Sequence, residues 1–244
     1  MRLHPKPAGW ARRQAGRYPW WLAVLALPCL ILSPAPALAM SGDAAAVQMA
    51  RGVVNAMGGS EKWARAEWVY SSETAWFSDR PSPAALQFWR RVGEPAEMGK
   101  IVGPGWSREH RWDRTGGYRL RNGVRSEISA ADLAQLHGWW RGEIYMMYVR
   151  FARDDSSLKL EATGDHSFRV RDGDRNLGEF FVDPSGALYR WRYGFGSESV
   201  DYVYGPLRDF GPIRAPSWGA LSDGSFRFFY TGFRLSASTP SGLP

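Results

Sequence analysis

The sequence contains one cysteine, Cys29, which lies in an N-terminal segment that we expect to be removed. The remaining chain can then form no disulfide, so its hydrophobic core must hold it together even in an oxidising compartment. Histidine is also scarce. His110, His137 and His166 lie far apart in the chain, without the spacing or the cysteine partners of a zinc site. We therefore expect no bound metal and no cofactor.

Common catalytic and phosphate-binding motifs are missing as well. The chain has no Gly-x-Ser-x-Gly around a serine nucleophile and no glycine-rich loop of the P-loop or Rossmann type. The acidic run 172–183 has the length of a calcium loop, but Leu177 stands where the loop needs glycine and Asp183 where it needs a bidentate glutamate. A turn between two strands explains these residues. His110 leaves a hydrolase open as an alternative, but we expect no enzymatic activity.

No apolar run reaches the roughly 20 residues that a membrane-spanning helix needs. The longest one, 20–32, is interrupted by Pro28 and follows a basic start. The small-residue sequence Ala37-Leu38-Ala39 comes next. Together these are the three parts of a cleaved export signal. We therefore expect residues 1–39 to be removed near Ala39 and the protein to be periplasmic.

A large excess of one charge is missing from the rest of the chain. The sequence has 31 basic and 24 acidic residues. Five basic and no acidic residues lie in 1–39, which leaves 26 basic residues against 24 acidic ones. A nucleic-acid binder needs a basic excess, so we expect no nucleic-acid partner. The remaining length suits one domain over 40–236, followed by a flexible tail over 237–244.

Aromatic residues are abundant, and many alternate with polar ones. They recur at every second position within 189–193, 202–204 and 226–230, and Trp68, Tyr70 and Trp76 share the even positions of 68–76. This period predicts β-strands with one aromatic face. In the first strand, the even-numbered aromatic residues are expected on one face and the polar side chains, such as Ser71 and Glu73, on the opposite, wet face. The sequence Asp183-Pro184-Ser185-Gly186 predicts a hairpin turn between two of the later strands.

Helical spacing is found in two segments. One begins at Asp43, a capping residue, and ends at Gly58. The other covers 129–152, opens with the capping pair Ser129 and Asp132, and is either continuous or broken near two glycines, Gly138 and Gly142.

The resulting order is helix, strands, helical segment, strands, with hairpins throughout. It predicts an α+β fold with a curled antiparallel sheet of about ten strands. We expect the sheet to form an open half-barrel whose concave face is covered by the helices.

Four features also carry a family resemblance: the helix end Ala56-Met57-Gly58-Gly59 followed by Trp63, the strand start Gly105-Trp106, the helical segment 129–152, and the strand-turn-strand 180–189. In their order, the chain from Asp43 to Ser236 resembles the LolA/LolB-like superfamily of periplasmic lipoprotein carriers. The resemblance implies a half-barrel with helices as a lid and an apolar cavity that holds acyl chains. For the arginine of the carrier cavity it leaves three candidates open, Arg65, Arg90 and Arg91.

An aromatic sheet face under helices indicates either a closed core or a ligand cavity. If a cavity is present, the candidate lining residues are Trp68, Tyr70, Trp76, Trp140, Ile144, Met147, Tyr189, Trp191, Tyr193, Tyr202, Tyr204, Phe226, Phe228 and Tyr230.

The function that follows is a non-enzymatic, monomeric binding protein that shelters a lipid, an acyl chain or another hydrophobic ligand. It would carry this ligand between envelope components, with an inner- or outer-membrane protein as a second partner. The alternative is an envelope protein-interaction or stress-sensing module that binds a partner polypeptide.

Overall fold

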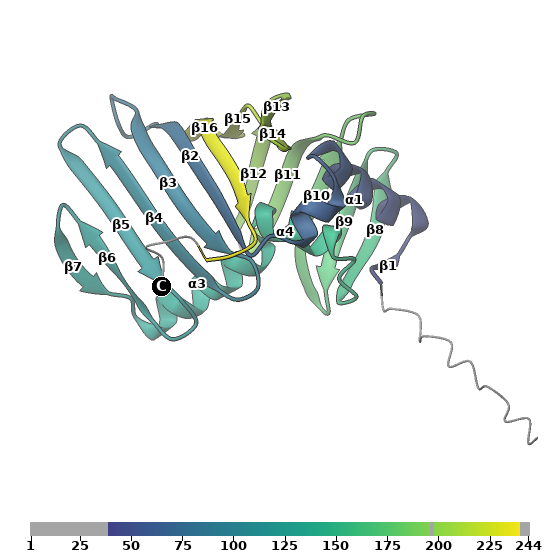
Figure 1. The fold of residues 1–244 in the computed structure, drawn as a ribbon, viewed down its shortest axis with the longest axis horizontal. Helices are drawn as coiled ribbons and strands as arrows, with labels where there is room; N and C mark the ends of the chain where they lie inside the picture. Colours follow the sequence, from purple (N-terminus) through teal and green to yellow (C-terminus); the bar gives the residue numbers. More distant parts are fainter. Residues whose placement is uncertain (1–38, 196–197, 240–244) are drawn as a thin grey trace, which may run out of the picture. The chain divides into compact units, whose positions relative to one another are not determined.

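Helices and strands follow one another in the order that the sequence predicts (Figure 1). The structure is a computed structural model that describes residues 39–195 and 198–239. These residues belong to one of the two units into which the chain divides, Leu38–Pro244. The expected export signal, apart from Ala39, lies outside the described residues, as does 240–244 of the expected tail.

The described helices are α1 (Ala44–Ala56), α2 (Ser60–Ala64), α3 (Ala130–Gly142) and α4 (Ile144–Ala152). A first set of strands comprises β1 (Ser41–Gly42), β2 (Trp68–Phe77), β3 (Ala84–Arg91), β4 (Ala96–Gly103), β5 (Trp106–Trp112), β6 (Gly117–Arg121) and β7 (Val124–Glu127). A second set comprises β8 (Leu158–Gly164), β9 (Ser167–Asp172), β10 (Arg175–Val182), β11 (Leu188–Phe195), β12 (Glu198–Tyr204), β13 (Leu207–Phe210), β14 (Ile213–Pro216), β15 (Trp218–Leu221) and β16 (Phe226–Ser236).

One large curled sheet dominates the unit. Within the described ranges it has 14 strands in the order β1-β8-β9-β10-β11-β12-β15-β16-β2-β3-β4-β5-β6-β7, and its two end strands do not pair with each other. Neighbours are antiparallel except β1 and β8, while β13 and β14 form a separate hairpin. The predicted number of about ten strands is wrong. The short strand β7 is exposed at all four positions and shows no apolar alternation, β15 lies in a segment rich in proline and glycine, and β1 has only two residues.

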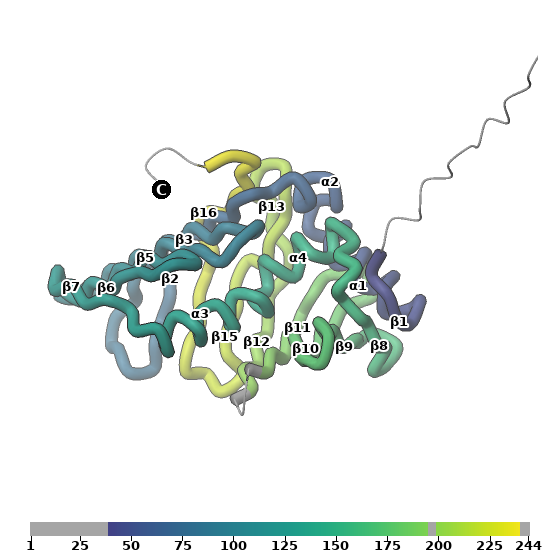
Figure 2. Tube along the Cα trace, turned by 90° about the horizontal axis from the view of Figure 1, so that it is seen from below, coloured from purple at the N-terminus to yellow at the C-terminus, as the bar shows by residue number. Residues whose placement is uncertain are grey.

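The two sets of strands meet where β16 pairs with β2. This ladder runs from Phe226 opposite Phe77 to Ser236 opposite Trp68. Helices α3 and α4 lie across one face of the sheet (Figure 2). Helix α3 contacts both sets, because the Trp140 indole donates a hydrogen bond to the carbonyl of Arg91 in β3 at 2.8 Å and the Tyr193 hydroxyl of β11 donates to the carbonyl of Trp139 at 3.2 Å.

Helix α1 begins after Asp43, as predicted, but the Asp43 carboxylate does not cap it. That carboxylate instead accepts a hydrogen bond from the backbone N–H of Ala162 in β8 at 2.9 Å and so ties the helix start to the sheet. The helix ends at Ala56, two residues before Gly58, whose φ of 105° is easily reached only by glycine. The backbone of Ile213 lies against this glycine, and a Cβ there would be 2.9 Å from the Ile213 Cα.

Helix α4 is buried on nearly all sides because the sheet covers one side and α1 and α2 pack on another. For example, the ring of Tyr148 in α4 meets Trp63 of α2 edge to face at 5.2 Å. Among the described helices, none is long and apolar enough to cross a membrane.

Candidate functional site

A cavity of about 280 Å³ lies between the sheet and the junction of α3 with α4. The side chains around its mouth are half-buried and apolar, among them Phe77, Ile101, Trp139 and Phe226. At its base the lining side chains are buried and polar, and they are Glu73, Arg90, Glu97, Glu143, Tyr145, Tyr204 and Tyr230. The cavity therefore combines an apolar entrance with a polar end.

Eight of the fourteen candidate residues line this cavity: Ile144, Trp191, Tyr193, Tyr202, Tyr204, Phe226, Phe228 and Tyr230. The six that do not are Trp68, Tyr70, Trp76, Trp140, Met147 and Tyr189. Met147 is buried in the core beneath the cavity, whereas Tyr189 is 46% exposed. Trp68 borders a separate hollow near the ends of β3 to β6.

The faces of β2 are reversed relative to the sequence-based prediction. Ser71 and Glu73, expected on the wet face, are 0% and 6% exposed and point to the cavity side. Tyr70 and Trp76 lie on the opposite face of the sheet, where arginines cover them. Arg234 lies over the Tyr70 ring at 4.6 Å, and Arg227 lies over the Trp76 ring at 5.2 Å. Such a strand shows the usual alternation of two faces, but its polar face is the buried one and its aromatic face is the outer one.

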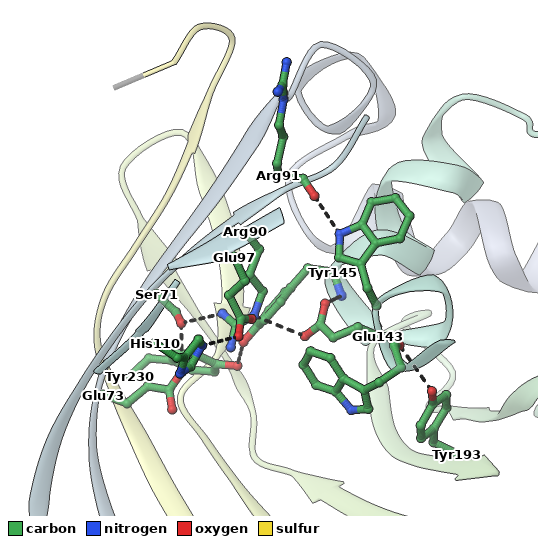
Figure 3. A network of polar contacts seen from close by, with 12 residues as sticks. Ser71, Glu73, Arg90, Arg91, Glu97, His110, Glu143, Tyr145, Tyr193 and Tyr230 are labelled. Carbon is green, nitrogen blue, oxygen red and sulfur yellow. Dashed lines mark hydrogen bonds and ion pairs between the residues drawn. The ribbon is translucent and has the colours of Figure 1, made fainter. Parts of the chain in front are cut away.

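Arg90 is the centre of the buried polar cluster (Figure 3). Its Nε lies 2.9 Å from Glu97 Oε2 and 3.8 Å from Glu143 Oε1, and its Nη1 donates a hydrogen bond to the Ser71 hydroxyl at 3.1 Å. The Ser71 hydroxyl in turn donates to Glu73 Oε1 at 2.8 Å. Three strands and the helix junction therefore contribute one guanidinium and three carboxyl groups to the same buried region.

Two further contacts complete the cluster. His110 of β5 places its Nε2 2.6 Å from Glu97 Oε1 and is 24% exposed. The hydroxyl groups of Tyr145 and Tyr230 are hydrogen-bonded to each other. Glu97 therefore has Arg90 beside Oε2 and His110 beside Oε1.

The break between α3 and α4 places Glu143 in the cluster. The backbone of Glu143 is extended, with φ −62° and ψ 141°, which ends α3 and turns the side chain inward. Glu143 Oε2 accepts a hydrogen bond from the Tyr145 N–H at 2.9 Å and so caps α4. Just before the break, Gly142 lies against the ring of Tyr193, where a Cβ would be 2.3 Å from Cε2.

Burial and the nearby basic groups shift the pKa values of these acids in different directions. Burial raises the pKa of Glu143 to about 7, and the attraction of Arg90 offsets it only in part. The pKa of Glu73 is also raised, mainly by burial. Burial alone would raise the pKa of Glu97 too, but Arg90 and His110 together hold it below its ordinary value. Glu97 is therefore the ionised partner of Arg90, while Glu143 can gain or lose a proton near neutral pH.

Of the three arginine candidates, only Arg90 reaches the cavity. Arg65 is exposed and pairs with Glu61 at 2.6 Å, and Arg91 points to the other face of the sheet, where it pairs with Glu94.

Sequence reasoning missed the acidic members Glu73, Glu97 and Glu143. The available signal was that Ser71 and Glu73 share a strand face with the apolar residues Val69, Ala75 and Phe77. Among the residues that the structure describes, no group of three or more His, Cys, Asp or Glu side chains is arranged to hold a metal ion.

Comparisons with known proteins add little to this geometry. No protein-family model matches the chain, and no curated protein matches it either. Among the solved structures, it is similar to the crystal structure of a DUF1329 family protein from Desulfovibrio piger. The two share 9% sequence identity over 84% of this chain and 96% of that chain, with a TM-score of 0.46. That degree of similarity supports no statement about function, and the resemblance to LolA/LolB-like carriers stays a prediction.

Proposed function

We propose that the protein is a periplasmic, non-enzymatic binding protein that shelters a lipid, an acyl chain or another hydrophobic ligand in this cavity. The observation that supports the proposal best is the set of half-buried aromatic and aliphatic side chains that surrounds the mouth of the cavity. An apolar ligand would cover this surface, with a gain of about 25 cal/mol for each Å² of apolar area removed from water.

The size of the cavity limits what can enter it. Pockets that enclose drug-sized ligands hold about 300 to 1,000 Å³, and this cavity, at about 280 Å³, is slightly smaller than that range. One chain or one ring system fits, and the rest of a larger ligand would extend past Ile101 and Trp139. Carrying such a ligand between envelope components would require α3 and α4 to move.

A dye-binding experiment with two matched variants tests the proposal. Val200 lines the cavity, whereas Val203 of the same strand lies on the opposite face and is opposite Ala220. We expect the neutral dye N-phenyl-1-naphthylamine to bind the natural protein. Val200→Trp should weaken binding at least about tenfold by filling the mouth, which corresponds to about 1.4 kcal/mol, and Val203→Trp should leave it unchanged.

Circular dichroism would confirm that both variants are folded. Absence of dye binding to the natural protein, or an equal loss in both variants, would contradict the proposal.

The alternative, a module that binds a partner polypeptide, is favoured by one observation. Strand β7 is an edge of the sheet, and all four of its residues are exposed, so an extended segment could pair with it. Native mass spectrometry of protein purified without detergent separates the two functions, because a carrier retains a small hydrophobic molecule and a module does not.

A further inference from the structure

We propose that the ligand of this cavity is an amphiphile with an ammonium group, and that this group lies at the buried end between the carboxyl groups of Glu73 and Glu143. The inference rests on the proposed function and specifies the chemistry of the ligand's polar end.

The first argument is the distribution of charge. Both basic groups of the cluster lie closest to one acid, because Arg90 lies 2.9 Å from Glu97 Oε2 and His110 lies 2.6 Å from Glu97 Oε1. Glu73 and Glu143 line the same cavity with weaker basic contacts: Glu143 Oε1 lies 3.8 Å from Arg90 Nε, and Glu73 forms no ion pair with a described basic residue. The buried end therefore has room for one more positive charge.

The second argument is the hydrogen bonding of these two acids. Glu73 is 6% exposed, and only its Oε1 accepts a hydrogen bond, from Ser71, within the part of the chain that the structure describes. Glu143 Oε1 lies 3.8 Å from Arg90 Nε, which is beyond hydrogen-bond distance. Both acids line the cavity, so a ligand there can reach their remaining acceptor positions, and an ammonium group can donate up to three hydrogen bonds.

The third argument is the aromatic wall around the acids. Tyr230 and Phe228 meet edge to face at 5.0 Å, and Tyr202 stacks between Trp191 at 5.8 Å and Tyr204 at 6.1 Å. Ammonium groups are attracted to the negative faces of aromatic rings. A cation already lies over rings here, since the Arg90 guanidinium is 4.4 Å from the Phe88 centroid and 5.0 Å from that of Tyr145.

The same features disfavour an anionic head group. A ligand carboxylate would lie beside Glu73 and Glu143, and Arg90 is already paired with Glu97. An alcohol can donate one hydrogen bond to a carboxyl group but brings no charge. The expected order of affinity for ligands with the same chain is therefore amine, alcohol, carboxylate.

Binding of an amine should also strengthen as the pH rises from 5 to 8, because burial raises the pKa of Glu143 to about 7 and this acid becomes charged over the interval. Burial raises the pKa of Glu73 as well. The titratable and charged groups that face the site are Glu73 of β2, Arg90 of β3, Glu97 of β4, His110 of β5, Glu143 and Tyr145 at the start of α4, Tyr193 of β11, Tyr202 and Tyr204 of β12, and Tyr230 of β16.

Three probes with the same ten-carbon chain test the inference: decylammonium, decanol and decanoate, each below its micelle concentration. Their dissociation constants would be measured by competition with N-phenyl-1-naphthylamine at pH 8 and pH 5. We expect decylammonium to bind at least about tenfold more tightly than decanoate at pH 8, and Glu73→Gln to remove most of this preference. Because Glu143 also caps α4, Glu73→Gln is the primary variant and Glu143→Gln the second.

Glu94→Gln, at an exposed acid that pairs with Arg91 outside the cavity, is the matched control and should keep the preference. If decanoate binds as tightly as decylammonium, or if the preference survives in both cavity variants, the inference is wrong while the proposed function stands. If none of the probes nor the dye binds, the proposed function fails and the inference fails with it.

Discussion

Arg90 is a single guanidinium that faces three buried carboxyl groups. Moving an ion out of water costs several kcal/mol even after the protein relaxes, so such a cluster weakens the fold unless each charge is well paired. Here Glu97 lowers the cost of burying Arg90. Burial alone would lower the pKa of Arg90, but the negative charges of Glu97, Glu143 and Glu73 raise it above its ordinary value. Costly polar clusters inside a cavity are typical of functional sites.

Arg90→Met should lower the free energy of unfolding by about 3 to 5 kcal/mol, because it leaves the Glu97 carboxylate buried without its partner. Arg91→Met is the matched control. Arg91 is the next residue, on the other face of the strand, with a side chain 38% exposed. Its loss should cost less than about 1 kcal/mol. Urea denaturation at pH 7 measures both, and equal losses would show that Glu97 does not depend on Arg90.

At this scale the sequence predicts side-chain periodicity but not which face of a strand is buried. The rings of Trp76 and Tyr70 lie on the outer face of the sheet, where Arg227 and Arg234 cover them. The inner face of the same strand carries Glu73, which is buried. The arginines that cover them come from β16, far along the chain, so a local pattern cannot reveal the arrangement. A functional cluster that breaks the local rule is where such reasoning is expected to fail.

The junction of α3 and α4 decides where Glu143 lies. The sequence predicts the start of this helical segment correctly, since the Ser129 hydroxyl accepts a hydrogen bond from the Asp132 N–H at 3.1 Å. It also predicts a break near Gly142 as one of two options, and the break is present at Glu143. The inward side chain was not foreseen, because it depends on contacts with strands from both sets.

The stability of the Glu143→Gln variant relative to the natural protein should increase as the pH rises. The pKa of Glu143 is about 7 in the folded protein against an ordinary value of 4.5. Below pH 4.5 the carboxyl group is protonated in both states and costs nothing, whereas above about 7 the folded state bears the full cost of ionising it. We expect the variant to gain up to about 3 kcal/mol relative to the natural protein between pH 4.5 and pH 8.

Glutamine can still accept the hydrogen bond from the Tyr145 N–H, so the cap of α4 is kept. Urea denaturation of both proteins across this pH range measures the gain, and a difference that does not change with pH would contradict the raised pKa.

Hairpins are predicted well where turn chemistry is explicit. The turn from Asp183 to Gly186 joins β10 and β11 as expected, with Asp183 Oδ1 accepting from the N–H of Ser185 at 2.8 Å. The turn between β6 and β7 uses Asn122 and Gly123, both with positive φ, but the exposed strand that follows gives no apolar signal. A strong turn beside a weak strand thus explains why β7 was not predicted.

On the scale of the whole described unit, stability should be distributed unevenly over the sheet. The central strands β2 and β16 are covered on one face by α4 and the core, and they share the longest ladder. At one end of the sheet, β7 is exposed and pairs only with β6.

Amide hydrogen exchange followed by mass spectrometry should therefore show at least about a hundredfold slower exchange for the hydrogen-bonded amides of β2 than for those of β7. Equal exchange in the two strands would mean that the sheet opens as one cooperative unit.

The ladder between β2 and β16 also affects how the chain matures. A nascent chain completes β2 long before β16 exists, so one edge of β2 has no partner through most of synthesis. Unpaired edges of aromatic strands promote aggregation, and contacts between distant segments form slowly. An unfinished chain is therefore exposed to aggregation until β16 emerges, and a product truncated before Phe226 would keep two open edges, those of β2 and β15.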